Sequence, residues 1–193
     1  RLVYEEADER FYVSVRRARS GRVLQIQAES KVTTEAWLLD ADDPAGPARL
    51  VAGREEGVEY RVEHHHAPGG EDRLFIVTNV DGAENFQLVV APASTPAREH
   101  WRVVVAGRDD VRLDRVDVFA RHLVLSERAG GVARLRALDL TSDADVTVDI
   151  GDEVATTWLG SSPEYDSSVV RVTTTSMVTP TTDYDYDLAT GAS

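Results

Sequence analysis

The chain has 193 residues, of which 42% are hydrophobic and 28% are charged, enough for one or two soluble globular domains. Its formal net charge of −13 argues against nucleic-acid binding, because phosphates require a basic surface. The absence of cysteine excludes disulfides, thiolate catalysis and cysteine-ligated zinc. No apolar run approaches the roughly 20 residues of a membrane-spanning helix, and residues 1–15 lack the pattern of a signal peptide. We therefore expect a cytoplasmic protein with no membrane or nucleic-acid partner.

Four short runs with the composition of β-strands occupy the first part of the chain. They are rich in Val, Leu, Tyr and Phe, and turn-forming Gly, Asp and Pro residues separate them. In the second run Leu24, Ile26 and Ala28 alternate with glutamines, so the apolar side chains share one face of a strand. The runs are ERFYVSVRRA (9–18), GRVLQIQAES (21–30), AWLLDADDP (36–44) and ARLVAGREEG (48–57).

Similar runs return along the rest of the chain. The third run of each unit begins at Ala36, Phe86, Arg134 and Asp183, so the unit repeats about every 48 to 50 residues. The second unit contains VEYRVEHHHA (58–67), EDRLFIVTNV (71–80), FQLVVAPAS (86–94) and WRVVVAGRDD (101–110). The third contains LDRVDVFARH (113–122), ARHLVLSERA (120–129), RLRALDLTS (134–142) and DADVTVDIGD (143–152). The fourth contains EVATTWLGSS (153–162), SSVVRVTTTS (167–176) and DYDYDLATG (183–191).

Four strands per unit at this spacing indicate the blades of a β-propeller. A four-stranded antiparallel sheet has two apolar faces, and stacking such sheets around an axis buries both. We predict an all-β protein with about four blades, at residues 8–56, 57–108, 109–150 and 151–193, the last without its outer strand. The first run of each unit is expected to lie nearest the central channel. Because an incomplete blade makes closure awkward, we expect part of a larger ring whose open terminal faces favour self-association.

The run DYDYDLATG raises the possibility of a calcium site. Its three aspartates match the first ligands of an EF-hand loop, but Leu188 stands where that loop needs glycine, and no bidentate glutamate follows. Strand alternation places the three aspartates on a wet face and the two tyrosines on a buried face. We therefore interpret the run as a strand.

The consecutive histidines His64, His65 and His66 raise the possibility of a zinc site. Two imidazoles on one side of a strand need further ligands, and the sequence nominates none. We expect partly exposed imidazoles at the end of an inner strand. His100 and His122 are isolated, and we expect them to be structural or on the surface.

No catalytic motif is found in the sequence. The nucleophile elbow G-x-S-x-G and the phosphate-binding patterns G-x-G-x-x-G and G-x-x-x-x-G-K-[ST] do not occur. Carboxylates are too numerous to single out an acid–base pair. The residues by themselves predict a binding or structural module without a cofactor.

Several stretches resemble the propeller domain of oligopeptidase B (protease II), the trypsin-like branch of the prolyl oligopeptidase family. They follow one another over essentially the whole chain, and TNVDGAENF and VTPTTDYDYDLATG are the most specific of them. The others are DERFYVSV, SKVTTEAWLLDADDP, REEGVEYRVEH and HWRVVVAGRDDVRLD.

The resemblance implies a seven-bladed propeller set over an α/β-hydrolase domain that carries a Ser-Asp-His triad. Full-length members cleave short peptides after Arg or Lys, and the propeller limits the entry of folded proteins. We expect this chain to supply about half of the ring, to be inactive by itself and to pack on the catalytic domain. The triad and specificity residues lie in segments that this sequence does not contain. Candidates for channel lining are the inner-strand residues Arg16, Arg61, Glu63, Asp117 and Thr157.

Two alternatives stay open at this point. The chain could be a self-standing four-bladed propeller that binds a ligand or protein in its channel. Its many carboxylates also leave open a sugar-active propeller enzyme, although no isolated pair is evident.

Overall fold

The computed structural model describes residues 2–142, 144–152 and 154–193, and over these ranges the chain is built from β-strands. The helical elements in these ranges are two short 3-10 turns, η1 (Val80–Gly82) and η2 (Arg98–His100). No helix in the described ranges is long and apolar enough to cross a bilayer.

The strands form four sheets in the described ranges. The first sheet contains β1 (Tyr12–Arg17), β2 (Val23–Glu29), β3 (Thr34–Asp40) and β4 (Arg49–Ala52), and the second contains β5 (Tyr60–His65), β6 (Arg73–Thr78), β7 (Gln87–Pro92) and β8 (Arg102–Val105). The last two contain β9 (Val111–Val118), β10 (His122–Ala129), β11 (Val132–Asp139), β12 (Asp145–Val148), and then β13 (Thr156–Leu159), β14 (Val169–Thr175) and β15 (Thr182–Asp187).

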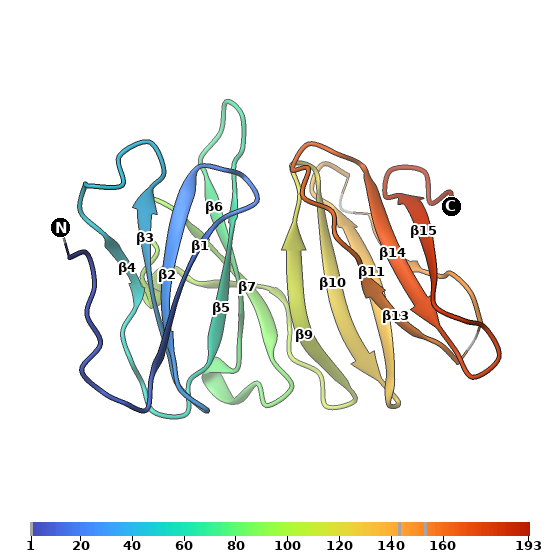
Figure 1. Ribbon diagram of the computed structural model, residues 1–193, viewed down its shortest axis with the longest axis horizontal. Helices are drawn as coiled ribbons and strands as arrows, with labels where there is room; N and C mark the ends of the chain where they lie inside the picture. The colour runs from blue at the N-terminus through green and yellow to red at the C-terminus, as the bar shows by residue number, and fades with distance from the viewer. Residues whose placement is uncertain (1, 143, 153) are drawn as a thin grey trace.

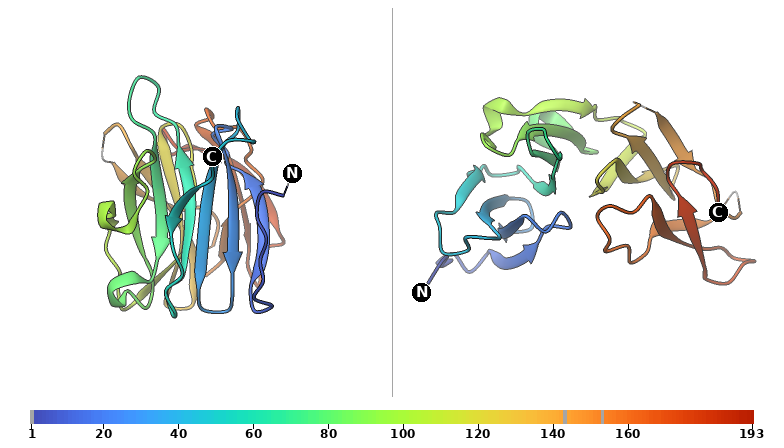
Figure 2. Two further views of the ribbon diagram at one scale, coloured as in Figure 1. Left: turned by 90° about the vertical axis from the view of Figure 1, so that its left-hand side faces the viewer. Right: turned by 90° about the horizontal axis from the view of Figure 1, so that it is seen from above.

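Within each sheet the strands pair antiparallel in chain order, so the first strand lies at one edge. Figure 1 shows the sheets following one another along the chain, and the view from above in Figure 2 shows that they form an arc. The first strands, β1, β5, β9 and β13, lie toward the concave side of this arc. The predicted all-β architecture of four-stranded antiparallel blades is confirmed, with three strands in the described part of the fourth sheet.

The extent of the ring stays a prediction, as do the blade boundaries at 8–56, 57–108, 109–150 and 151–193. The predicted runs 143–152 and 153–162 begin at Asp143 and Glu153, which lie outside the described residues.

Apolar side chains form a separate core at each junction between neighbouring sheets. Between the first two sheets, Leu38 and Val51 pack with Val62 and Ile76, all at most 2% exposed. Burial of each such side chain stabilises the fold by about 1.5–3 kcal/mol. Similar cores join the second sheet to the third through Phe75, Val77, Leu113 and Val116, and the third to the fourth through Phe119, Val124, Val170 and Val172.

Tyr60 of β5 links the first two sheets through its hydroxyl group. The pairing of β3 with β4 shifts by one residue between Ala36 and Trp37, which makes a β-bulge. The Tyr60 hydroxyl stands at this bulge, accepting a hydrogen bond from the Ala36 N–H at 2.8 Å and donating one to the Ala52 carbonyl at 2.6 Å. Tyr60 is 1% exposed, and its burial raises the pKa of the phenol. A side chain from the second blade therefore satisfies two backbone groups of the first.

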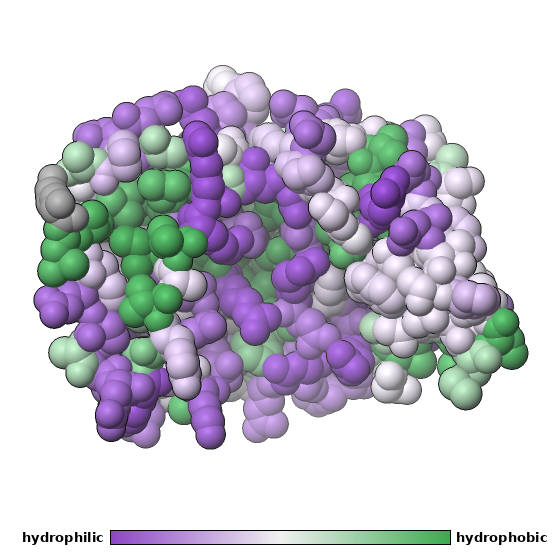
Figure 3. Space-filling view, viewed as in Figure 1, coloured by the Kyte–Doolittle hydropathy of each residue, from purple (hydrophilic) through white to green (hydrophobic). Residues whose placement is uncertain are grey.

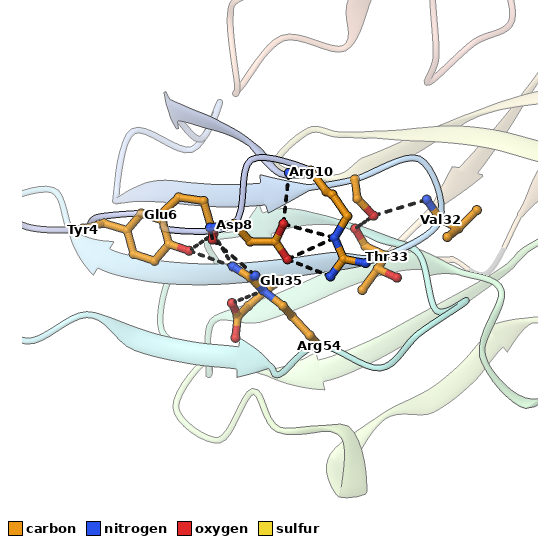
Figure 4. Close-up of polar contacts among 9 residues, drawn as sticks. Tyr4, Glu6, Asp8, Arg10, Val32, Thr33, Glu35 and Arg54 are labelled. Carbon is orange, nitrogen blue, oxygen red and sulfur yellow. Dashed lines mark hydrogen bonds and ion pairs between the residues drawn. The ribbon is translucent and has the colours of Figure 1, made fainter.

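Arg54 holds the segment before β1 against the first sheet (Figure 4). Its guanidinium pairs with Glu6, donates to Glu35 at 2.9 Å and donates to the Tyr4 hydroxyl at 3.1 Å. The hydrogen bond from Arg54 is the main cause that lowers the pKa of Glu6 to about 2. The Tyr4 ring packs on Trp37, with 4.6 Å between ring centroids. The segment thus covers part of the outward face of the first sheet.

The rest of this outward face is apolar and exposed. Val13 and Val15 of β1 are 47% and 69% exposed, and Leu50 of β4 is 44% exposed. Val15 pairs with Ile26, Ile26 with Trp37 and Trp37 with Leu50, so these side chains share one side of the sheet. Figure 3 shows hydrophobic residues gathered over this blade. We call the surface of Val13, Val15 and Leu50 the open face.

Candidate functional site

An ion pair on the concave side of the arc joins the first two sheets. Arg16 of β1 lies 2.7 Å from the Glu63 carboxylate of β5 and also donates to the Val62 carbonyl at 2.6 Å. Burial raises the pKa of Glu63, and the charge of Arg16 opposes that rise. The Glu63 side chain is 17% exposed, whereas that of Arg16 is 43% exposed. The cation therefore faces solvent and the carboxylate lies beneath it.

A second ionic contact reaches from the first sheet to the third. Arg19, in the turn between β1 and β2, donates to the Asp117 carboxylate of β9 at 2.8 Å and to the Val118 carbonyl at 3.3 Å. The Arg19 guanidinium also lies over the Phe119 ring, 4.3 Å from its centroid. On the other side, Nε of Arg115 lies 2.8 Å from Oδ2 of Asp117. Residues about 100 positions apart are thus joined on the concave surface.

The five residues predicted to line the channel occupy three different settings. Arg16, Glu63 and Asp117 belong to the ionic contacts that cross between sheets. Arg61 is exposed and donates to the carbonyl of Asp114 on the third sheet at 3.1 Å. Thr157 is 9% exposed and donates to the Thr174 hydroxyl of its own sheet at 3.4 Å. Their role in lining a closed channel stays a prediction.

A pocket of about 280 Å3 lies where the first three sheets meet. The end of β2 and the first residues of β5 and β9 surround it, and most of its charged groups come from these strands. Arg61 is one of them, so one predicted channel residue borders a real hollow. Figure 3 shows that the middle of the concave side is hydrophilic.

The three consecutive histidines are more buried than we expected. His64 and His65 are 2% and 3% exposed, so the prediction of partly exposed imidazoles is wrong for both, while His66 is partly buried. Nδ1 of His64 lies 2.8 Å from the Ser20 hydroxyl, and its Nε2 lies 3.4 Å from the Asp72 carboxylate. Burial lowers the pKa of His64 to about 4. Loops of neighbouring sheets cover this end of β5, and the alternation of residues within one strand does not predict such cover.

Each of these histidines contacts a different part of the arc. His64 meets the β1–β2 turn through Ser20, and His65 donates to the Ala120 carbonyl after β9 at 3.0 Å. The Tyr165 hydroxyl, from the loop between β13 and β14, accepts from the His66 N–H and donates to the His66 carbonyl, both at 2.8 Å. Because His64 is covered, its contact with serine and aspartate ties loops together and does not present a nucleophile.

The DYDYDLATG run forms β15 and its first turn residues, which confirms the strand interpretation. Tyr186 is 5% exposed in the core, whereas Asp183 and Asp185 are exposed. Asp183 accepts a hydrogen bond from Thr173 at 2.6 Å, and Asp185 pairs with Arg171 at 2.9 Å. In the described part of the chain, no three His, Asp or Glu side chains are grouped to hold a metal ion.

The whole chain, residues 1–193, matches the family model described as the N-terminal beta-propeller domain of prolyl oligopeptidase. The chain belongs to the prolyl oligopeptidase family. It is 36% identical over 190 residues to dipeptidyl aminopeptidase BI of Pseudoxanthomonas mexicana, covering 98% of this chain and 25% of that relative. It is 30% identical over 191 residues to protease 2 of Moraxella lacunata, covering 98% and 26%. The chain thus spans about a quarter of the length of these prolyl oligopeptidase relatives.

Solved structures of the same family share this arc of blades. Oligopeptidase B from Trypanosoma brucei with covalently bound antipain, in a closed form, matches with a TM-score of 0.89 and 33% identity over 98% of this chain and 27% of that chain. Oligopeptidase B from Leishmania major matches with a TM-score of 0.88 and 28% identity, again over 98% and 27%. The resemblance to the oligopeptidase B propeller found in the sequence is confirmed.

Proposed function

We propose that this chain is the non-catalytic propeller portion of a serine oligopeptidase that cleaves short peptides after Arg or Lys. The main support is its likeness, at a TM-score of 0.89 and 33% identity, to an oligopeptidase B with covalently bound antipain. In this proposal the Ser-Asp-His triad belongs to an α/β-hydrolase domain of the parent protein, and that domain packs on the propeller. The cytoplasmic location expected from the sequence is part of the same proposal.

The propeller would act by limiting which substrates reach the chamber. Contacts that cross between sheets, such as Arg16 with Glu63 and Arg19 with Asp117, support a wall that keeps its shape. A rigid wall with a narrow channel admits extended peptides and excludes folded domains. The open face supports the idea of further blades, because a propeller buries both faces of every sheet. A seven-bladed ring would bury Val13, Val15 and Leu50 against its last blade.

The proposal is tested by comparing the isolated chain with its parent protein. The isolated chain is expected to show no turnover of short amide substrates ending in Arg or Lys, and the parent is expected to cleave them. The parent should also cleave a short peptide much faster than the same sequence placed in a folded protein. Turnover by the isolated chain that survives exhaustive purification would overturn the proposal, and so would equal cleavage of folded and short substrates by the parent.

Two other readings have specific support. The relative at 36% identity is named dipeptidyl aminopeptidase BI, which favours release of dipeptides from N-termini as an alternative specificity. Blocking the substrate N-terminus abolishes that reaction but not internal cleavage after Arg or Lys.

The chain could also act as a stand-alone binding propeller, since its described residues form four sheets. A stable, closed monomer by solution mass and scattering would favour that reading, whereas self-association through the open face favours a partial ring.

A further inference from the structure

The pocket at the junction of the first three sheets has a basic wall built around Asp114. Arg61 donates to the Asp114 carbonyl at 3.1 Å, and Nε of Arg112 lies 3.1 Å from the Asp114 carboxylate. The Arg128 guanidinium lies 3.5 Å from the other carboxylate oxygen. The guanidinium groups of Arg112 and Arg128 therefore share the Asp114 carboxylate, while that of Arg61 contacts the backbone of the same residue. The side chains of Arg112 and Arg128 are 48% and 56% exposed, so both can donate hydrogen bonds to an anionic group of a ligand.

The basic wall is held in place before any ligand arrives. The Arg112 guanidinium lies over the Phe86 ring, 4.7 Å from its centroid, and Arg61 is bonded to the backbone of the neighbouring sheet. Pre-placed guanidinium groups lose little freedom on binding, and their planar fork matches the geometry of a carboxylate. The chain as a whole carries a net charge of −13, so this local surplus of positive charge runs against its overall charge.

The pocket also has an acidic side. Glu29, at the end of β2, and Glu59, just before β5, both line it. In the described part of the chain neither glutamate forms an ion pair, and Glu29 accepts a hydrogen bond from Gln27 at 2.7 Å. The pocket therefore combines a basic wall, where three arginines surround the single carboxylate of Asp114, with an acidic wall of two glutamates. A ligand that fits both walls carries one carboxylate and one cationic group.

We propose that this pocket binds the C-terminal end of a short peptide, with the free carboxylate against Arg112 and Arg128 and a basic terminal side chain toward Glu29 and Glu59. The proposal rests on the proposed function, because cleavage after Arg or Lys produces peptides that end in a basic residue with a free carboxylate. An uncleaved substrate has an amide at that position. The pocket thus distinguishes product from substrate and holds the product on the propeller side of the chamber.

The first test uses the unaltered chain and four peptides in isothermal titration at low salt. They are acetyl-Ala-Arg as the free acid, its C-terminal amide, acetyl-Ala-Ala as the free acid, and acetyl-Ala-Glu amide. The Arg acid is expected to bind about tenfold tighter than its amide, the factor given by one charge-assisted hydrogen bond of ordinary strength. It is also expected to bind tighter than the Ala acid. Equal binding of acid and amide overturns the proposal. Equal binding of the Glu amide overturns the assignment to a C-terminal carboxylate.

A pair of matched variants supplies the second test. Arg112→Gln is expected to weaken binding of the Arg acid about tenfold and to remove the difference between acid and amide. Arg49→Gln removes the same charge from the outer strand β4, where the arginine is exposed, and is expected to leave binding unchanged. An equal loss of affinity in both variants overturns the assignment of binding to this pocket, because it means that net charge alone sets the affinity. If Arg112→Gln does not fold, the comparison of the Arg acid with its amide on the unaltered chain still decides whether the pocket binds a free carboxylate.

This test and that of the proposed function can fail separately. If acid and amide bind equally while the parent protein still cleaves after Arg or Lys, the product site alone is overturned. If the parent does not cleave after Arg or Lys, the proposed function is overturned, and the titration still reports whether the pocket binds a carboxylate.

Discussion

Replacing Tyr60 by Phe removes one oxygen atom from the junction between the first two blades. The hydroxyl accepts from the Ala36 N–H at 2.8 Å and donates to the Ala52 carbonyl at 2.6 Å, at the bulge between β3 and β4. Tyr60 is 1% exposed, so water does not readily replace the lost oxygen. The substitution Tyr60→Phe therefore leaves the buried Ala36 N–H and the partly buried Ala52 carbonyl without their partner, while the ring still fills its place in the core.

The expected loss follows from these two groups. The buried Ala36 N–H left unpaired costs about 1–3 kcal/mol, and the partly buried Ala52 carbonyl adds about 1 kcal/mol, so Tyr60→Phe should lower the free energy of unfolding by ~2–4 kcal/mol. Urea unfolding at 25 °C measures this as a lower midpoint with an unchanged slope, since the buried area barely changes. Tyr12→Phe is the matched control, because Tyr12 is 77% exposed, and it should change stability by less than about 0.5 kcal/mol. A loss below about 0.5 kcal/mol in Tyr60→Phe would refute the assigned role of the hydroxyl.

Three further predictions follow from other contacts. Tyr165→Phe removes both hydrogen bonds to the His66 backbone and should cost about 1–2 kcal/mol in urea unfolding; an unchanged midpoint contradicts this clamp. Burial lowers the pKa of His64 from 6.5 to about 4, so the unfolded chain takes up the proton first, and stability is lost as the pH falls from 6.5 toward 4. His64→Gln should flatten the pH dependence of the unfolding free energy in this window, and an undiminished slope argues against His64 as its source. Val15→Arg, on the open face, should reduce self-association in sedimentation experiments, whereas Val103→Arg on β8 should not; equal effects would exclude the open face as the contact.

The strands could be predicted from the sequence because the alternation of apolar and polar side chains is a local property. Leu24, Ile26 and Ala28 alternate with glutamines, and β2 forms over Val23–Glu29 with those apolar residues on one side. The repeat of about 48 to 50 residues then predicts several such sheets, since a single sheet cannot bury its own faces. The same reasoning placed both tyrosines of β15 on the buried face, and the structure buries Tyr186 fully and Tyr184 partly.

The contacts on the concave side of the arc could be predicted from the sequence only in part. The inner-strand positions of Arg16, Glu63 and Asp117 follow from the order of the runs, but their partners do not. Arg19 lies in a turn, and its contact with Asp117 depends on how three sheets curve around one another. The basic wall at Asp114 likewise draws its arginines from two sheets, so no spacing in the sequence marks it.

The sequence by itself determined the strands, their repeat and the family, because these depend on side-chain alternation, turn residues and motifs that are local in the chain. The tertiary structure decided what each exposed or buried polar group does. It buried His64 and His65 under loops of other blades, placed the Tyr60 hydroxyl in a bulge of the first sheet, and left the open face uncovered. Those outcomes depend on the curvature of the arc, which is set by packing between whole sheets and not by the residues within any one of them.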